Sequence, residues 1–445
     1  MKPSPRLAAV LFLLFACAPA FGEEGGPAAP PPGGLFAPSA LEELDGSPGS
    51  PVLTAPRWRQ ALHDAGRLAG EAGALPDAAR VREAAARRAK SGLVPIGLLD
   101  LSVPSGDGAG AIGIFAAAAL KEHTYRVEEA RFVLDAERLF SGGPVGARLE
   151  IDPDDGGGFR ALPIGEPVGA RYGSAGEKTV RVRAIDPDGS ERISSFRFDV
   201  RALAAPLPDD TLAIAATVPY LGQYGAGEAY VYLSDSHATL TNPAVVIEGF
   251  DLDDTMNWEE LYALLNQQNL VETLRDEGFD AVVLNFDQAT DYMQRNSFVV
   301  VALIEQVLAS IEPDREIVLI GASMGGIVSR YALTWMESQS IDHRVRTFIS
   351  FDAPQRGAAI PLGVQYWLDF FSDLSTDAAF LLSRLDTPAA RQLLVYHHTS
   401  PPGSTGEPDS LRPAFDAELA SIGGWPALPR KVAVANGSGA GAGQG

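Results

Sequence analysis

A serine stands between two glycines in the run Gly321-Ala322-Ser323-Met324-Gly325. Because glycine has no Cβ, this spacing allows the chain to turn sharply and to present the serine hydroxyl to a substrate. Such a hydroxyl can attack an acyl carbonyl once a base removes its proton. The N–H of the next residue, at the start of a helix, can then donate to the oxyanion. The alternative is a glycine-rich turn with an incidental serine.

The segments on either side of the motif favour the chemical interpretation. The unbroken apolar run Ile317–Ile320 predicts a strand that is buried on both faces and ends at the serine. Apolar residues then recur at helical spacing, as expected for a helix that begins directly after the turn: Ile327, Val328, Tyr331, Ala332 and Trp335.

Further strands and helices alternate over residues 211–445. Apolar runs predict strands at residues 244–247, 280–286, 345–351 and 431–436, in addition to the one that ends at the serine. Apolar residues at helical spacing predict one helix over residues 258–274 and another over 298–311. This alternation predicts an α/β fold with a parallel, doubly wound sheet.

The order of these elements and the run from Gly321 to Leu333 resemble the α/β-hydrolase superfamily, and the elbow of its lipases and esterases in particular. The resemblance spans about residues 240–436. It implies a serine ester hydrolase that forms an acyl-enzyme on Ser323, with no metal or organic cofactor and with an ester or lipid-like substrate. The same nucleophile also suits a peptidase or an acyltransferase, and an inactive binding protein on this fold is a third possibility.

The resemblance also suggests the partners of the serine. The family places its oxyanion loop after the strand that ends at Ile247, so the N–H groups of Phe250 and Met324 are the expected oxyanion donors. Glu248 occupies a position where lipases often carry histidine, and it is either part of that loop or a strand-end carboxylate with a local hydrogen bond. Asp352, at the end of the strand after the elbow, is either the triad acid or a capping residue, and Gln355 replaces the histidine of a common lipase segment.

The general base of this set is expected to be a histidine. The superfamily supplies a histidine after its last strand, so we expect the base to follow residue 445, in a chain truncated at its C-terminus. His397 and His398 are weaker candidates within the sequence. The sequence contains six histidines: His63, His123, His237, His343, His397 and His398.

Two more segments of this region are unusual. The polar run Asp291–Asn296 either braces the site or caps the following helix through Asp291 or Asn296. Residues 358–430 form a cap insertion between two strands, with an aromatic cluster that includes Trp367 and Phe370. The insertion is either a mobile cover over an acyl-binding cleft or a packed cap without a gating role.

The N-terminal part predicts export. Residues 1–21 have the charge and apolar pattern of a signal peptide, and Cys17 lies in a lipobox-like context that makes it a lipidation candidate. The protein is therefore expected in the periplasm or outside the cell, ordinarily cleaved or as an outer-membrane lipoprotein of a bacterium. Residues 22–56, rich in proline and glycine, predict a disordered linker, and residues 57–92 predict two short, solvated helices.

Residues 94–203 change to alternating apolar and polar residues with turns between them. Segments 125–127, 147–151, 179–184 and 194–200 predict strands of an antiparallel β-sandwich. The stretch from Tyr172 to Gly189 resembles the end of a polycystic-kidney-disease-type immunoglobulin-like domain, which implies a spacer or a surface- or polysaccharide-binding accessory. Its acidic turns either bind Ca²⁺ or are ordinary turns.

Composition excludes some partners. The chain has 445 residues, a formal net charge of −22 and one cysteine. This charge argues against nucleic acid and against an anionic membrane surface as partners, so that membrane contact is expected only through a lipid on Cys17. The lone cysteine excludes an intrachain disulfide.

Overall fold

The computed structural model describes residues 41–69, 75–76, 78–105, 110–126, 129–142, 147–201, 206–400 and 406–435. The predicted signal peptide, Cys17 and residues 22–40 lie outside them. The described residues divide into a C-terminal unit (within residues 205–370 and 381–445) and an N-terminal unit (within residues 22–204 and 371–380). Within the described residues, no helix is long and apolar enough to cross a membrane.

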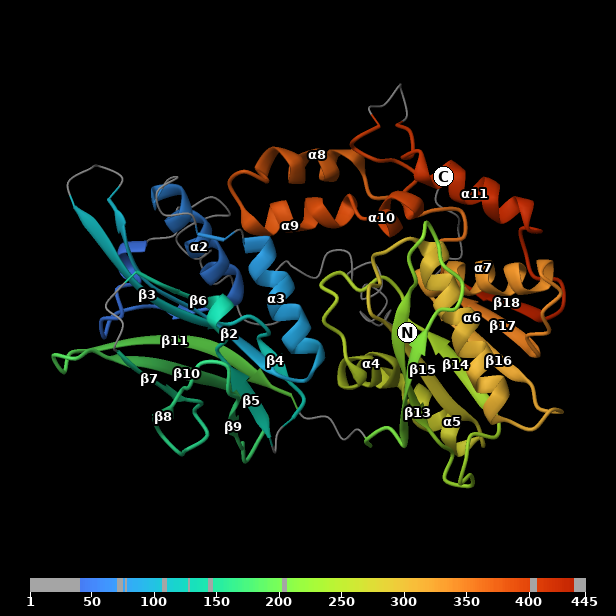
Figure 1. Cartoon of the computed structure of the whole chain (residues 1–445), viewed down its shortest axis with the longest axis horizontal. Helices are drawn as coiled ribbons and strands as arrows, with labels where there is room; N and C mark the ends of the chain where they lie inside the picture. Colours follow the sequence, from blue (N-terminus) through green and yellow to red (C-terminus); the bar gives the residue numbers. More distant parts are fainter. Residues whose placement is uncertain are drawn as a thin grey trace, which may run out of the picture. The chain divides into compact units, whose positions relative to one another are not determined.

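A seven-stranded sheet forms the centre of the C-terminal unit, in the order β12-β13-β15-β14-β16-β17-β18 (Figure 1). Neighbouring strands from β15 to β18 in this order run parallel to one another, whereas β13 is antiparallel to both β12 and β15. This is the doubly wound order that the sequence predicts, with an antiparallel edge. The strands are β12 (Asp210–Ala215), β13 (Ala226–Tyr232), β14 (Pro243–Ile247), β15 (Asp280–Phe286), β16 (Ile317–Ala322), β17 (Val345–Phe351) and β18 (Arg430–Val434).

Burial follows the position of each strand in this sheet. Every residue of β14 and β15 is buried, as expected for parallel strands covered on both faces, whereas most of the edge strand β18 is exposed. Helices α6 (Met293–Ser310) and α7 (Met324–Ser338) pack against each other and against strands of the sheet. The bounds of β15 and β17 are those predicted from the sequence.

Two predicted helices have different bounds in the structure. The single helix expected over residues 258–274 is wrong, because the chain forms α4 (Trp258–Leu265), a 3-10 turn and α5 (Leu270–Asp276). Asn269 ends the turn in the left-handed region at φ 57°, a conformation that asparagine tolerates and that interrupts a helix. Helix α6 begins at Met293, before its predicted start at Phe298, because polar residues form its buried first turn.

The described part of the segment between β17 and β18 consists of helices joined by turns and irregular chain. It contains α8 (Leu362–Phe371), α9 (Thr376–Leu385), α10 (Pro388–Leu393) and α11 (Leu411–Ser421). Gln365 of α8 is fully buried and donates to the carbonyls of Ile360 (2.8 Å) and Tyr396 (3.0 Å). These bonds fix α8 to the chain that follows α10.

The N-terminal unit contains two sheets that share one apolar core. One sheet has the order β1-β11-β10-β7-β8, with β4 beside β11, and the other has the order β3-β2-β5-β9, with β6 beside β2. The expectation of purely antiparallel strands is wrong, since β1 and β4 pair with β11 in parallel, and β5 and β6 pair with β2 in parallel. The strands are β1 (Val52–Leu53), β2 (Val94–Pro104), β3 (Ala111–Ala119), β4 (His123–Thr124), β5 (Ala130–Val133), β6 (Leu139–Ser141), β7 (Arg148–Asp152), β8 (Arg160–Ala161), β9 (Val168–Ala170), β10 (Gly176–Ile185) and β11 (Glu191–Val200).

The predicted disordered linker is wrong for residues 41–56. Leu41, Leu44 and Leu53 are buried in the core, and β1 pairs with β11. A few well-placed leucines therefore order a stretch whose average composition predicts disorder. The strand predicted at residues 125–127 is also misplaced, because β4 ends at Thr124, and Val127 lies outside the described residues.

The two predicted helices are present as α2 (Ala55–Ala69) and α3 (Ala78–Lys90), but they are not merely solvated. Trp58 of α2 is fully buried, and its Nε1–H donates to the Ala116 carbonyl at 2.9 Å. Gly97 leaves room for the ring, since a Cβ there would lie 2.5 Å from it. The helix is thus part of the core.

Residues 371–380 of the predicted cap group with the N-terminal unit. Asp377 forms ion pairs with Arg59 (3.1 Å) and Arg82 (2.8 Å), and the Thr376 N–H donates to Gln60. The guanidinium of Arg82 also lies 3.6 Å from the Phe380 ring centre. The sequence alone does not predict this association, because more than 280 residues of chain lie between the partners.

The acidic turns of the N-terminal unit bond to the protein itself. Asp155 pairs with Arg160 at 2.6 Å and accepts from the Gly157 N–H at 3.0 Å, and Asp154 accepts from the Thr179 N–H. Carboxylates in such turns are satisfied without a cation. These contacts favour ordinary turns over a calcium site.

Candidate active site

Ser323 stands in a strained conformation between β16 and α7. Its φ is 52° and its ψ is −125°, in a region that only glycine adopts without strain. The turn is held on both sides, because the Ser323 N–H donates to the Phe351 carbonyl at 2.9 Å and its carbonyl accepts from the Gly326 N–H at 3.1 Å. The side chain is partly exposed. Strain of this kind, maintained by the surrounding structure, is typical of a nucleophile elbow.

Backbone atoms crowd every glycine of the motif. A Cβ at Gly321 would lie 2.5 Å from the Gly325 carbonyl oxygen, and a Cβ at Gly325 would lie 2.3 Å from the Glu248 carbonyl oxygen. A Cβ at Gly326 would meet the Ala353 Cβ at 2.5 Å. The three glycines therefore allow the turn, the end of β14 and the end of β17 to approach one another.

Both predicted oxyanion donors lie on segments that adjoin the serine. Met324 is the first residue of α7, so its N–H belongs to those that a helix leaves without an intrahelical acceptor. On the other segment, a Cβ at Gly249 would lie 3.2 Å from the Ser323 Cβ and 3.7 Å from its Oγ. Phe250 follows directly. This arrangement is compatible with an oxyanion hole that receives one N–H from each segment.

Glu248 performs the local role that the sequence left as an alternative. Its side chain is buried and accepts a hydrogen bond from the Phe286 N–H at the end of β15. Because β14 and β15 pair in parallel, this bond ties their carboxyl ends together behind the loop that carries Gly249.

Asp352 lies level with the serine on the neighbouring strand. Ala322 pairs with Phe351, so that the residue after each belongs to the same row of the sheet edge. The backbone of Asp352 is also left-handed, at φ 46°, and its N–H donates to the Val434 carbonyl at 2.6 Å. The structure thus brings Asp352 to the site, and its role as triad acid stays a prediction.

Gln355 connects the elbow helix to β17. Its Nε2 donates to the Gly326 carbonyl (3.2 Å) and to the Ser350 hydroxyl (3.0 Å), while its Oε1 accepts from Arg330 (3.1 Å). Arg330 lies over the Trp425 ring, 3.8 Å from its centre, and burial lowers the pKa of its guanidinium to about 10. The residue that replaces the lipase histidine therefore braces the turn.

The described structure shows no hydrogen bond between a histidine and the Ser323 hydroxyl. In the C-terminal unit, His237 pairs with Asp280 at 2.8 Å, and His343 pairs with Glu337 at 3.2 Å. His63 and His123 belong to the N-terminal unit.

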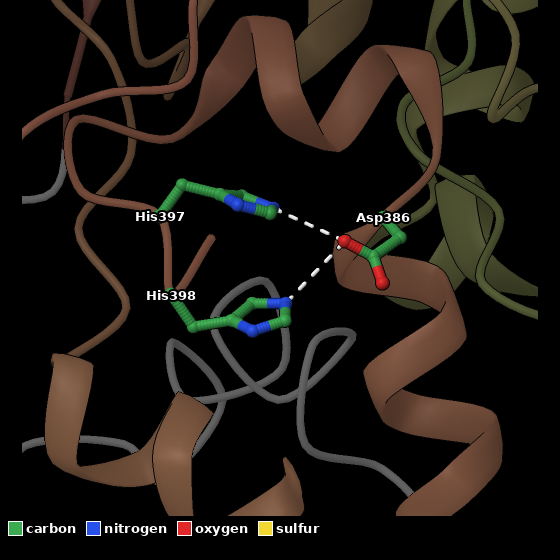
Figure 2. A group of neighbouring side chains, drawn as sticks. All are labelled: Asp386, His397 and His398. Atoms are coloured by element: carbon green, nitrogen blue, oxygen red, sulfur yellow. Dashed lines mark ion pairs between the residues drawn. The ribbon is translucent and has the colours of Figure 1, made fainter. Parts of the chain in front are cut away.

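The two weaker base candidates, His397 and His398, meet Asp386 instead (Figure 2). His397 is fully buried, with Nε2 on the Leu385 carbonyl at 2.9 Å and Nδ1 on the Thr399 hydroxyl at 2.7 Å, and burial lowers the pKa of its ring. His398 Nε2 lies 3.3 Å from Asp386 Oδ1. Both nitrogens of His397 are thus engaged away from the serine.

A buried polar network joins the elbow helix to the cap, and sequence reasoning did not find it. Glu418 of α11 accepts from Tyr331 of α7 at 2.6 Å and from Gln294 of α6 at 2.8 Å. Gln392 of α10 donates to Gln294 at 2.7 Å and accepts from the Met293 N–H at 2.8 Å. Burial, together with Glu418, raises the pKa of the Tyr331 hydroxyl. These bonds favour a packed cap over a mobile one at α10 and α11.

The polar run Asp291–Asn296 braces the start of α6 without capping it. Tyr292 is the N-cap residue and makes no side-chain cap bond. Asp291 pairs with Arg295, whose guanidinium also donates to the Tyr220 carbonyl, and Asn296 donates to the Gln288 carbonyl at 3.2 Å. The alternative in which Asp291 or Asn296 caps the helix is therefore wrong.

The fold and the elbow define an α/β-hydrolase-like domain. A model of the family described as "PGAP1-like alpha/beta domain" matches residues 275–395, which include β15, the elbow and α7. No curated protein matches the chain.

Several solved structures similar to the chain are esterases. Est1E from Butyrivibrio proteoclasticus is 12% identical, over 50% of this chain and 88% of that one, with a TM-score of 0.24. An esterase of Pyrobaculum calidifontis is 15% identical, over 53% and 78%, with a TM-score of 0.29. One of two fungal esterases from Rhizomucor miehei is 13% identical, over 52% and 75%, with a TM-score of 0.28. The fold assignment itself depends on the strand order and the elbow conformation.

Proposed function

We propose that this chain is an exported serine hydrolase that cleaves carboxylic esters through an acyl-enzyme on Ser323. The observation that carries the proposal is the strained backbone of Ser323, held between the end of β17 and the loop at Gly249. A hydroxyl in this position attacks the carbonyl carbon of the ester, and the alcohol leaves with a proton from the general base.

In this proposal, the N–H groups of Met324 and Phe250 bind the oxyanion, and Asp352 orients the histidine that serves as base. Water then attacks the acyl-enzyme, and the acid product leaves. The elbow at Ser323 and the family match over residues 275–395 are compatible with this reaction. Export rests on the predicted signal peptide, and surface contact rests on the resemblance of the stretch from Tyr172 to Gly189 to an accessory domain.

The test uses a fluorophosphonate probe and p-nitrophenyl esters of increasing acyl length. We expect labelling at Ser323 and ester turnover, and we expect Ser323→Ala to abolish the first and to lower the second about 10⁴-fold or more. Ser338→Ala is the matched control, because Ser338 is an exposed serine at the far end of the same helix, bonded to the Trp335 carbonyl and the Gln339 side chain.

The outcomes also separate the alternatives. Labelling without turnover of any ester would favour a peptidase or an acyltransferase with the same nucleophile. If the chain shows no labelling and no turnover, the catalytic proposal is overturned and a binding protein is favoured. The bonds of His237, His343 and His397 to groups other than Ser323 lend weight to that alternative.

A further inference from the structure

Two adjacent histidines of the C-terminal unit direct the same type of ring nitrogen at one carboxylate. His397 Nε2 lies 3.7 Å and His398 Nε2 lies 3.3 Å from Asp386 Oδ1, and the three ligand atoms lie within 4.8 Å of one another (Figure 2). Ligand atoms around a tetrahedral zinc ion, at bond lengths of about 2.0–2.1 Å, are separated by about 3.3 Å. The spacing of the cluster is therefore close to that of a metal site.

His398 provides an independent indication. Its side chain is only 10% exposed, and its Nε2 is inaccessible to solvent and makes no hydrogen bond. A buried imidazole nitrogen without a hydrogen bond is costly unless something else engages it. Because this nitrogen faces Asp386, a cation between them would satisfy both groups.

The backbone around the histidines is already fixed. The His397 N–H donates to the Glu407 carbonyl at 3.0 Å, and the His398 N–H donates to Gln365 Oε1 at 3.0 Å. The ring of His397 has an outer partner as well, since Thr399 Oγ1 lies 2.7 Å from its Nδ1. Without a metal, His397 Nε2–H donates to the Leu385 carbonyl at 2.9 Å, and Nδ1 accepts from the Thr399 N–H at 3.3 Å. A metal at Nε2 would replace the first bond and require the ring proton to move to Nδ1, from which the Thr399 hydroxyl can accept it.

Arg391 is a cation that contacts the cluster. Its Nη2 lies 3.1 Å from Asp386 Oδ1, and its Nη1 lies 3.4 Å from Asp409 Oδ2. Two carboxylates thus surround one guanidinium, and Asp409 retains Arg391 when Asp386 binds a metal. The local charge therefore permits a divalent ion.

We propose that Asp386, His397 and His398 bind a divalent transition-metal ion, Zn²⁺ in the first instance. Two imidazoles and one carboxylate form a donor set that suits zinc with one further ligand and suits Ca²⁺ or Mg²⁺ poorly. The ion would cross-link the end of α9 to the segment before α11 and so stabilise the cap. The proposal is independent of the chemistry at Ser323.

The test is a titration of the whole chain with ZnCl₂, followed by isothermal calorimetry. We expect one bound ion per chain, no binding of Ca²⁺, and a melting temperature that rises with free zinc. His398→Gln and Asp386→Asn should each weaken binding about 100-fold or more, because even the loss of an outer partner costs about 10- to 100-fold. His63→Gln is the matched control, since His63 also has a buried Nε2 without a hydrogen bond but lies in the N-terminal unit.

A second measurement does not depend on the folding of a variant. Cobalt bound to the wild-type chain should give the intense visible absorption of a four- or five-coordinate ion. Added zinc should displace the cobalt and remove this absorption. A wild-type chain that binds neither zinc nor cobalt would overturn the proposal. Variants of Asp386 and His398 that bind zinc as tightly as the wild type would overturn it as well.

Discussion

Around Ser323 the backbone itself fills the space, whereas around Glu418 and Asp386 side chains do so. A Cβ at Gly321, Gly325 or Gly326 would lie only 2.3 to 2.5 Å from a neighbouring atom, so the elbow requires glycine at all three positions. The cap depends on hydrogen bonds between side chains from four helices. The elbow is therefore expected to tolerate almost no substitution at its glycines. In the cap, each substitution is expected to lower the free energy of unfolding by a smaller and independent amount.

The largest expected effect tests the crowding at the elbow. Gly325→Ala should lower the free energy of unfolding by about 3 kcal/mol, because its Cβ would overlap the Glu248 carbonyl oxygen, which is backbone and cannot rotate away. Urea denaturation of the C-terminal unit measures the change.

The cap offers a matched glycine for this experiment. A Cβ at Gly363 on α8 would meet no atom within 4 Å, so Gly363→Ala should leave stability unchanged or raise it by up to about 1 kcal/mol. If both variants behave alike, the contrast between backbone and side-chain construction is wrong.

A smaller effect is expected in the polar network of the cap. Glu418→Gln should cost about 2 kcal/mol, because the charge-assisted hydrogen bonds from the Tyr331 hydroxyl and the Gln294 amide are replaced by neutral ones and only one acceptor oxygen remains. The control is Asp416→Asn on the same helix, because the Asp416 carboxylate is half exposed and its ion pair with Arg412 should contribute less than about 1 kcal/mol. Equal losses in thermal denaturation would contradict the assignment of the network as the anchor of α11.

The smallest effect measures the strain stored at the nucleophile. Ser323→Gly should raise the free energy of unfolding by about 1 kcal/mol, since glycine adopts φ 52° and ψ −125° readily. Ser323→Ala retains the Cβ and should leave stability within about 0.5 kcal/mol of the wild type. An alanine variant as stable as the glycine variant would show that the turn stores no strain.

The sequence predicted the regions in which local pattern and tertiary structure agree. Apolar runs located the central strands, and the glycine spacing located the elbow, because a fully buried strand and a crowded turn both restrict residue type at each position. The helix expected over residues 258–274 failed at Asn269, where one left-handed residue outweighs an apolar periodicity.

Long-range partners were harder to predict. Glu418 and Asp386 have ordinary neighbours in the sequence, and their partners lie far along the chain or in a turn without periodicity. In the N-terminal unit, buried leucines at 41, 44 and 53 ordered a stretch that composition assigns to a linker. Average composition reports the cost of ordering a chain, but not the few contacts that offset it.

The bond between Tyr331 and Glu418 has a dynamic consequence. Tyr331 lies two turns beyond Ser323 on α7, and Glu418 lies near the end of α11, so neither helix can open without breaking the same buried bond. The amide protons of the two helices should therefore exchange with solvent in one cooperative event, although more than 80 residues separate them. Loosening of α11 would then destabilise α7, the helix that begins directly after the nucleophile.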